Sequence, residues 1–411
     1  MSQTEASPAG NAASIVNAAP SSARLLVVDD NEDNRYTLTL QLELEGYQHV
    51  ATAEHGEEAL LLLDQQDFDL LLLDVMMPKL NGYQVLERLK AQGRLHNLPV
   101  IMISALNEVA SVVRCIELGA EDYLPKPFDP VLLRARVGAS LEKKRLRDEV
   151  RAHLARVEEE LASARQLQMS MVPRVFPPPS KERPIELFAT MEPAREVGGD
   201  LYDFFDGPEG SFYFLIGDVS GKGVPAALFM ARTKNLVRLI TRMARAEDGS
   251  TLAPSEIVSM VNRELCQDNA SMMFVTLFFG VVRPDRREVN FCNAGHNPPY
   301  HLRATRAEQL PTAKGRPLGL RADSAYETVT LLMSFGELLY LYSDGITEAA
   351  DVSGALFSEQ RLEHALLSTP SASANAVVGA VADAVKRFVG AAQQSDDITA
   401  MAVRLMDAST L

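Results

Sequence analysis

Cysteines and long apolar runs are scarce in this 411-residue sequence. Its three cysteines, Cys115, Cys266 and Cys292, are widely spaced and odd in number, which fits reduced thiols in a cytosol better than a disulfide framework. No apolar run reaches the ~18 residues that a membrane-spanning helix requires. We therefore expect a cytoplasmic protein with no membrane partner.

Basic residues are also in deficit, since 40 Lys and Arg stand against 55 Asp and Glu and give a net charge of −15. Nucleic acids bind basic surfaces, so this balance argues against a general nucleic-acid-binding protein. The apolar content of 46% is enough for two cores, and the length predicts two or three domains. Residues 1–23 lack the basic start and apolar centre of a signal peptide and are predicted to be a disordered tail.

Strand and helix patterns alternate from Arg24 to about residue 138. The short apolar runs that predict buried strands are 25–28, 49–51, 70–73, 100–103 and 123–124. The helical patterns that follow them begin after a cap at Asn31 and then cover 56–63, 82–89, 108–118 and the stretch from Pro130 onward. Leu38, Leu42 and Leu44 are predicted to form the apolar side of the first helix. The alternation predicts an α/β fold, a doubly wound parallel five-stranded sheet whose active end is the carboxyl edge of its strands.

Acidic residues follow two of these strands, with Asp29 and Asp30 after the first and Asp74 after the third. A serine follows the fourth strand and a lysine the fifth, and with these the region resembles a two-component receiver domain. A flavodoxin-like domain with coincidental acids is the alternative, but Pro78 and Gly82 lie at the receiver spacing from Asp74 and weigh against it.

The receiver resemblance implies that Asp74 accepts a phosphoryl group, with a sensor histidine kinase as the partner. A bound Mg²⁺ would offset the crowded negative charge and let the carboxylate attack the phosphoryl donor. The resemblance assigns the Mg²⁺ to Asp29, Asp30, Asp74 and the carbonyl of Met76. It assigns the conformational switch to Ser104, Tyr123 and Lys126, and implies a cis bond between Lys126 and Pro127.

A helical pattern without loop signals continues beyond the receiver. From Val150 a set of residues alternates at spacings of four and three, the seam of a coiled coil; they are Val150, Leu154, Val157, Leu161, Ala164, Gln168 and Met171. Ala164 and Gln168 are weak positions in this seam. This seam predicts a homodimer held by the linker helix, and the alternative is one amphipathic helix folded back on its own domain. Pro173 and the prolines at 177–179 stop the helix.

The last region places acidic residues beside the ends of apolar strands. Asp200 follows two glycines, Asp218 comes two residues after the run 212–216, Asp344 follows the run 340–342, and an acidic pair precedes the last strand at 400–403. Buried carboxylates need cations or hydrogen-bond donors, and all-oxygen sites suit Mg²⁺ or Mn²⁺. Each Asp could instead be a simple turn residue, but that reading does not easily cover all four points.

Six motifs in this region carry a second resemblance: VGGD, GDVSGKG, AGHNPP, PLGL, YSDG and DDIT, in that order. They resemble the SpoIIE-like branch of the metal-dependent PPM serine/threonine phosphatases over roughly residues 165–405. The resemblance implies an α+β fold of two stacked sheets flanked by helices. Long helices are predicted at 224–243 and 254–265, and the apolar positions of the first include Ala227, Leu228, Ala231, Leu236 and Ile240.

The phosphatase resemblance also implies the roles of single residues. Asp218 bridges two Mn²⁺ or Mg²⁺ ions and Val219 adds its carbonyl, Asp344 and Asp396 bind one of the ions, and Asp200 acts directly or through water. These four aspartates form the implied catalytic set, while Asp397 supports the ligands from outside. Two metals activate a bridging water, so no covalent intermediate is needed, and none of the three cysteines lies in an anion-binding loop. His296 could act as a general acid, but its place in a Gly-His-Asn-Pro turn favours a structural role. Arg195 lies shortly before Asp200 and is a candidate for binding the substrate's phosphate.

Two hypotheses about function follow. The first is a response regulator whose receiver phosphorylation controls a phosphoserine/phosphothreonine protein phosphatase, with a phosphorylated STAS-type anti-sigma-factor antagonist as the implied substrate. The second is a non-catalytic adaptor in a sigma-factor pathway, since some receiver–phosphatase proteins have lost their metal ligands. The intact Asp218, Asp344 and Asp396 favour the enzyme. The predicted parts are a tail at 1–23, the receiver at 24–138, the linker at 139–173 and the phosphatase at 174–411.

Overall fold

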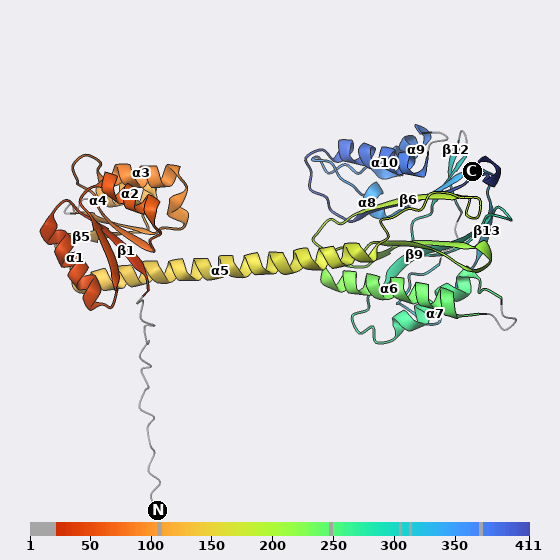
Figure 1. Ribbon diagram of the computed structural model, residues 1–411, viewed down its shortest axis with the longest axis horizontal. Coiled ribbons are helices and arrows are strands. Elements are labelled where there is room, and N and C mark those ends of the chain that lie inside the picture. The colour runs from red at the N-terminus through yellow and green to blue at the C-terminus, as the bar shows by residue number, and fades with distance from the viewer. Residues whose placement is uncertain (1–21, 105–108, 246–249, 304–305, 312–314, 370–372) are drawn as a thin grey trace, which may run out of the picture. The chain divides into compact units, whose positions relative to one another are not determined.

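The structure is a computed structural model that describes residues 22–104, 109–245, 250–303, 306–311, 315–369 and 373–411 (Figure 1). The predicted tail therefore lies almost wholly outside the described residues, as does the expected helix start at Glu108. The chain forms two compact units, one ending at Arg156 and the other beginning at Val157. None of the described helices combines the length and the apolar character needed to cross a membrane.

The N-terminal unit contains a parallel five-stranded sheet in the order β2-β1-β3-β4-β5. Its strands are β1 (Arg24–Val28), β2 (His49–Ala53), β3 (Leu70–Asp74), β4 (Val100–Ser104) and β5 (Asp122–Pro125). Its helices are α1 (Glu32–Leu44), α2 (Gly56–Gln65), α3 (Gly82–Ala91), α4 (Val109–Leu118), α5 (Pro130–Met171) and the short η1 (Arg94–His96). The predicted alternation and the Asn31 cap of α1 are confirmed.

Two apolar cores lie on the opposite faces of this sheet, because buried parallel strands present side chains to both sides. Leu38 and Leu42 of α1 pack into one core as predicted, but the prediction for Leu44 is wrong, since 79% of its surface is exposed. Leu44 lies two residues after Leu42, which turns it about 200° around the helix axis.

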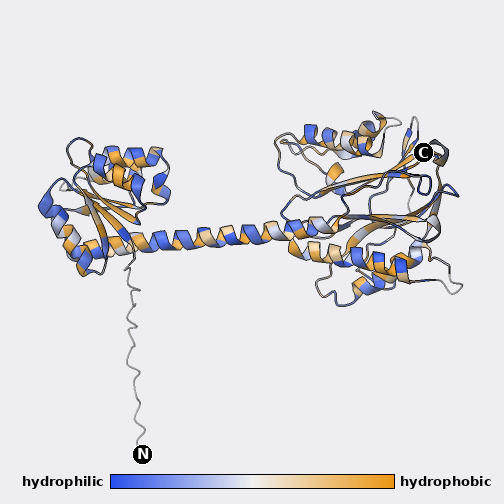
Figure 2. Ribbon diagram, viewed as in Figure 1, coloured by the Kyte–Doolittle hydropathy of each residue, from blue (hydrophilic) through white to orange (hydrophobic). Residues whose placement is uncertain are grey.

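Helix α5 is one uninterrupted helix of 42 residues. Its first turns belong to the N-terminal unit, where Leu133 and Val137 are buried in the core. Figure 2 shows that the stretch between its two ends is mostly hydrophilic. Within that stretch Val150, Leu154 and Val157 remain 59%, 56% and 37% exposed, so no described residue covers this part of the predicted seam.

The C-terminal unit contains two antiparallel five-stranded sheets, in the orders β13-β10-β9-β8-β7 and β12-β11-β14-β15-β6. The first sheet is built from β7 (Leu201–Asp206), β8 (Phe212–Val219), β9 (Val275–Arg283), β10 (Glu288–Ala294) and β13 (Val329–Leu332). The second is built from β6 (Ile185–Glu192), β11 (Tyr300–Arg303), β12 (Arg306–Gln309), β14 (Leu338–Tyr342) and β15 (Ile398–Leu405). The turns η2 (Pro208–Gly210) and η3 (Ala408–Thr410) complete the unit's short elements.

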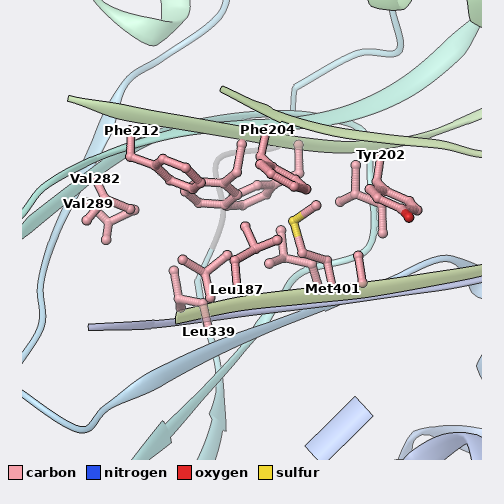
Figure 3. Close-up of a cluster of buried hydrophobic side chains, with 14 of the residues drawn as sticks. Leu187, Tyr202, Phe204, Phe212, Val282, Val289, Leu339 and Met401 are labelled. Carbon is pink, nitrogen blue, oxygen red and sulfur yellow. The ribbon is translucent and has the colours of Figure 1, made fainter. Parts of the chain in front are cut away.

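The two sheets pack face to face, and helices cover both outer faces (Figure 1). Phe204 and Phe212 of one sheet meet Leu187, Leu339 and Met401 of the other in the central core (Figure 3). Helices α6 (Val224–Met243) and α7 (Pro254–Cys266) bury a second core against the first sheet. Helices α8 (Asp344–Thr347), α9 (Ser358–Leu367) and α10 (Ala374–Val389) bury a third against the second sheet. The layers are helix, sheet, sheet and helix, which confirms the predicted architecture.

Of the apolar positions predicted for α6, Leu236 and Ile240 pack against the core, but Leu228 does not. Leu228 is 67% exposed, whereas Phe229, Lys234 and Val237 are buried. The reason is Asp203 on β7, which is fully buried and accepts two hydrogen bonds from Arg238, one of them at 2.6 Å, with Lys234 Nζ 3.4 Å away. A buried carboxylate requires such partners, so the helix turns its cations toward the sheet.

Candidate functional site

An acidic pocket lies at the carboxyl edge of the N-terminal sheet. Asp29, Asp30 and Asp74 each offer a carboxylate oxygen, and these oxygens all lie within 4.8 Å of one another. Asp29 follows β1 and Asp74 ends β3, and β1 and β3 are neighbours in the sheet, so the parallel topology itself brings the two side chains together. This all-oxygen donor set suits a hard divalent cation such as Mg²⁺.

Lys126 is the cation of this pocket. Its Nζ lies 2.7 Å from Asp29 Oδ2 and 3.0 Å from Asp74 Oδ1. The pKa of Asp74 is raised to about 6, mainly by burial and also by the charges of Asp29 and Asp30, against the hydrogen bond and charge of Lys126, which lower it. Excess negative charge therefore remains in the pocket and favours a bound cation.

The remaining predicted receiver residues lie on the expected elements. Ser104 ends β4 and is buried, Tyr123 is half-buried on β5, and the side chain of Met76 is exposed in the loop after β3. The peptide bond between Lys126 and Pro127 is cis, as the resemblance implied.

A second acidic cluster lies at one end of the C-terminal sandwich. Asp200 immediately precedes β7, and Asp218 lies near the end of β8, with Leu201 paired to Gly217 between these strands. On the other sheet Asp344 starts α8 directly after β14, and Asp396 comes two residues before β15. Strands of both sheets thus deliver carboxylates from widely separated parts of the sequence to one site.

The carboxylates of this cluster raise one another's pKa values. Burial raises the pKa of Asp218 to about 7, with further contributions from the charges of Asp344 and Asp396. The pKa of Asp200 is raised by burial and by the charge of Asp218, and that of Asp344 by burial, Glu348 and Asp396. Asp200 Oδ2 is buried without a hydrogen-bond partner among the described residues. Divalent cations would relieve both the repulsion and the unpaired oxygen, so the donor set fits the implied metals.

The four predicted phosphatase aspartates are more widely spaced than those of the N-terminal pocket. Among the described residues, no three of them offer oxygens within 4.8 Å of one another. Mutual repulsion separates like charges, and Lys222 of the loop after β8 pairs with Asp396, Nζ to Oδ2, at 3.0 Å. Val219, the implied carbonyl ligand, is buried at the end of β8 beside Asp218.

Asp397 organises the loop that carries Asp200. Its Oδ1 accepts a hydrogen bond from the backbone N–H of Ala194 at 2.8 Å, and its Oδ2 accepts from Gly199 at 2.7 Å and Asp200 at 3.3 Å. A side chain at Gly198 could not fit, since its Cβ would lie 2.1 Å from Asp397 Oδ2. The Gly-Gly-Asp motif therefore closes on the Asp-Asp motif, a pairing that the sequence alone does not reveal.

Gln168, near the end of α5, holds the same loop from the other side. Its Nε2 donates to the carbonyl of Gly198 at 2.6 Å, and its Oε1 accepts from the N–H of Gly198 at 3.1 Å. Sequence reasoning treated Gln168 as a weak position of the coiled-coil seam and missed this role. The signal that could have found it is a lone polar residue at an otherwise apolar seam position.

His296 is buried in the turn after β10 and is 4% exposed. Its Nδ1 lies 2.9 Å from Thr276 Oγ1, and the side chain of Asn293 bonds both the N–H and the carbonyl of His296. Burial lowers the pKa of His296 to about 4, so the ring is neutral at pH 7. These contacts favour the structural role over that of a general acid. Arg195 is exposed in the segment before Asp200, and its role as a phosphate clamp stays a prediction.

Two family models match the chain, one for each compact unit. The response regulator receiver domain model matches residues 25–138, and the model of Stage II sporulation protein E (SpoIIE) matches residues 208–406. The chain carries a receiver domain and a SpoIIE domain. The SpoIIE match includes Asp218, Asp344 and Asp396 but begins after Asp200.

Curated relatives resemble parts of the chain. Protein IcfG of Synechocystis sp. is 29% identical over 264 residues, which cover 59% of this chain and 41% of the relative. Transcriptional regulatory protein CpxR of Escherichia coli is 48% identical over 120 residues, which cover 29% of this chain and 50% of the relative. The chain thus spans half or less of the length of these relatives.

A solved structure shares the fold of the C-terminal unit. The SiaA-PP2C domain of Pseudomonas aeruginosa is similar with a TM-score of 0.53 and 20% identity, over 62% of this chain and 98% of that domain. At this identity the similarity concerns the fold alone. The SpoIIE domain therefore has the layered PP2C architecture that its motifs predicted.

Proposed function

We propose that this chain is a response regulator in which the receiver domain controls a metal-dependent phosphoserine/phosphothreonine protein phosphatase. The observation that carries the proposal is the convergence of Asp200, Asp218, Asp344 and Asp396, from two sheets, at one end of the SpoIIE sandwich. Burial and mutual charge raise the pKa values of three of these carboxylates, Asp200, Asp218 and Asp344, which is typical of a functional site.

Asp218, with the Val219 carbonyl, Asp344 and Asp396 would hold two Mn²⁺ or Mg²⁺ ions, with Asp200 close by. Bound metal supplies a water of lowered pKa and charge to bind the substrate's phosphate. The protein's own residues keep the carboxylates in place: Asp397 and Gln168 fix the loop before Asp200, and Ser343 donates its backbone N–H to Thr399 at 2.9 Å between the other two ligand segments.

The receiver domain would act on this site through α5. Asp74 would accept the phosphoryl group from a sensor histidine kinase with Mg²⁺ bound by Asp29, Asp30, Asp74 and the Met76 carbonyl. Ser104, Tyr123 and Lys126 would respond to it. Helix α5 is the next element after the receiver strand β5, and near its other end Gln168 bonds the Gly198 loop. One helix would therefore connect the receiver to the phosphatase site.

The substrate class follows from the resemblance of the SpoIIE domain, and a second partner follows from the exposed positions of α5. We propose a phosphorylated STAS-type anti-sigma-factor antagonist as the substrate. We propose a second copy of the chain as a partner through α5, because Val150, Leu154 and Val157 lie exposed at coiled-coil spacing.

The test is hydrolysis of a phosphoserine STAS-type antagonist, or of an aryl phosphate, by the full chain with Mn²⁺, with and without beryllofluoride. Activity that requires Mn²⁺, is lost in Asp218→Asn and changes with beryllofluoride supports the proposal. Asp74→Ala should remove the beryllofluoride response and leave the basal rate. A folded protein that binds Mn²⁺ but hydrolyses nothing in any state would contradict the phosphatase and favour the sigma-pathway adaptor.

A further inference from the structure

Both carboxylate oxygens of the predicted ligand Asp396 have partners. Its Oδ1 accepts a hydrogen bond from the N–H of Asp397 at 2.9 Å, and its Oδ2 lies 3.0 Å from Lys222 Nζ. Asp200 differs, since its Oδ2 has no hydrogen-bond partner in the described part of the chain. A cation that binds Asp396 through Oδ2 must therefore replace an existing interaction, whereas one that binds Asp200 need not.

The loop that carries Lys222 is held in place at its start. Ser220 donates its N–H to the carbonyl of Phe274 at 2.9 Å, and its Oγ accepts from the N–H of Phe274 at 3.0 Å. Gly221 and Gly223 on either side of Lys222 have φ of +88° and +79°, a conformation that other residues rarely adopt. The lysine also donates to the carbonyl of Ser395 at 2.6 Å, so its ammonium is fixed by two acceptors rather than free in solvent.

Lys222 is also the main local counter-charge of the cluster. Across the described residues it is the one Lys or Arg that forms an ion pair with any of Asp200, Asp218, Asp344 or Asp396. Its side chain and that of Asp396 are 37% and 38% exposed, so the pair is moderate in strength and can be exchanged.

We propose that Lys222 is a built-in competitor for the metal site: its ammonium occupies Asp396 and sets the divalent-cation concentration at which the SpoIIE domain becomes active. This deepens the proposed function and rests on it. A divalent cation at Asp396 has to displace the ammonium or bind beside it, and both are unfavourable because the charges have the same sign. Lys222 thus acts through Asp396 and is a positioning residue, not a catalytic one.

The test is Mn²⁺ binding to the full chain, measured by calorimetry and by the electron paramagnetic resonance of free Mn²⁺, neither of which requires turnover. Lys222→Met removes the charge and keeps most of the volume, and we expect about tenfold tighter Mn²⁺ binding to the SpoIIE domain. Lys222→Arg keeps the charge and should bind Mn²⁺ within about twofold of the unaltered chain. Asp218→Asn identifies which part of the isotherm belongs to this site, because the receiver site is unaltered in all variants.

A matched control is Lys181→Met. Lys181 lies before β6, whose first residue Ile185 pairs with Leu405, at the opposite end of β15 from Asp396. The two ends of β15, Ile398 and Leu405, are seven residues and about 23 Å apart. Removal of the Lys181 charge should therefore not change Mn²⁺ affinity.

Unchanged or weaker Mn²⁺ binding by Lys222→Met would overturn the inference. So would a variant with unchanged Mn²⁺ affinity and a raised KM, because Lys222 would then bind the substrate's phosphate. If the SpoIIE domain of the unaltered chain bound no Mn²⁺ at all, the proposed metal-dependent phosphatase would itself fail, and this inference with it.

Discussion

The carboxylates of Asp396 and Asp397 are neighbours in sequence but have different tasks in the structure. Asp396 is 38% exposed in its side chain and meets Lys222, whereas Asp397 is buried and accepts hydrogen bonds from three backbone N–H groups. In the extended segment that leads into β15, successive side chains point to opposite sides. Asp396 and Asp397 therefore have different partners.

Replacing Asp397 by Ala should destabilise the protein, because buried N–H groups of Ala194, Gly199 and Asp200 would lose their acceptor. We expect a loss of about 1–3 kcal/mol in the free energy of unfolding, measured with denaturant, together with a loss of turnover. Asp396→Ala should lose Mn²⁺ affinity with at most about 1 kcal/mol of stability. Equal stability of the two variants would contradict the assigned roles.

His296 should make the SpoIIE domain sensitive to acid. Its pKa is lowered to about 4 in the folded state, below the ordinary 6.5, so the unfolded chain binds the proton more readily between these values. Stability is therefore present above pH 6.5 and is lost as the pH falls, by about 2 kcal/mol between pH 7 and pH 5.

The check is the free energy of unfolding of the unaltered chain and of His296→Gln at pH 7 and pH 5. The variant should lose less stability on acidification. His301, whose pKa is also lowered by burial, titrates equally in both proteins and cancels in the comparison. The same pH slope in both proteins would disprove the effect.

At the scale of elements, the end of α5 is the point where the linker meets the loop that carries Asp200. Gln168 both donates to and accepts from Gly198, and a glutamate at this position could accept but not donate. We expect Gln168→Glu to lower kcat at least about tenfold while the fold is kept, because the Asp200 loop loses its anchor. Gln166→Glu, two residues away on the exposed side of α5, is the matched control and should retain activity.

The middle of α5 should pair with a second copy of the chain. Leu154→Glu places a charge in the exposed apolar seam and should shift the protein to monomers in sedimentation or light-scattering measurements. Ala152→Glu adds the same charge on the opposite, exposed side and should leave the dimer intact. Monomers in the unaltered chain would refute pairing through α5.

At the scale of the whole molecule, the continuity of α5 is what would connect receiver and phosphatase. Arg156 is exposed at the division between the two units, and Arg156→Pro removes a helical hydrogen bond there at a cost of about 3 kcal/mol to the helix. The basal Mn²⁺-dependent rate should persist while the response to beryllofluoride disappears, and Arg156→Ala should keep both. A response that survives the proline would show that the signal bypasses the helix.

Most of the fold could be predicted because its signals are local. Apolar runs and helix periods located the strands and helices within a few residues, and short motifs located Asp29, Asp74, Asp218, Asp344 and Asp396 at strand ends. The errors at Leu44 and at Leu228 have different causes: Leu44 is turned about 200° around α1 from the buried Leu42, whereas α6 turns its cations toward a buried carboxylate. Apolar character alone does not say which side of a helix is buried when the neighbouring sheet carries a charge such as Asp203.

The sequence by itself determined the two domain types, the positions of the site aspartates at the ends of strands, and the helical linker. Each of these depends on residues close together in the chain. Only the tertiary structure decided the contacts that organise the site. Gln168 meets Gly198 across 30 residues, Lys222 meets Ser395 across 173 and Asp397 meets Gly199 across 198. Such pairs depend on how sheets and loops close in space, and no local preference of a side chain specifies its distant partner.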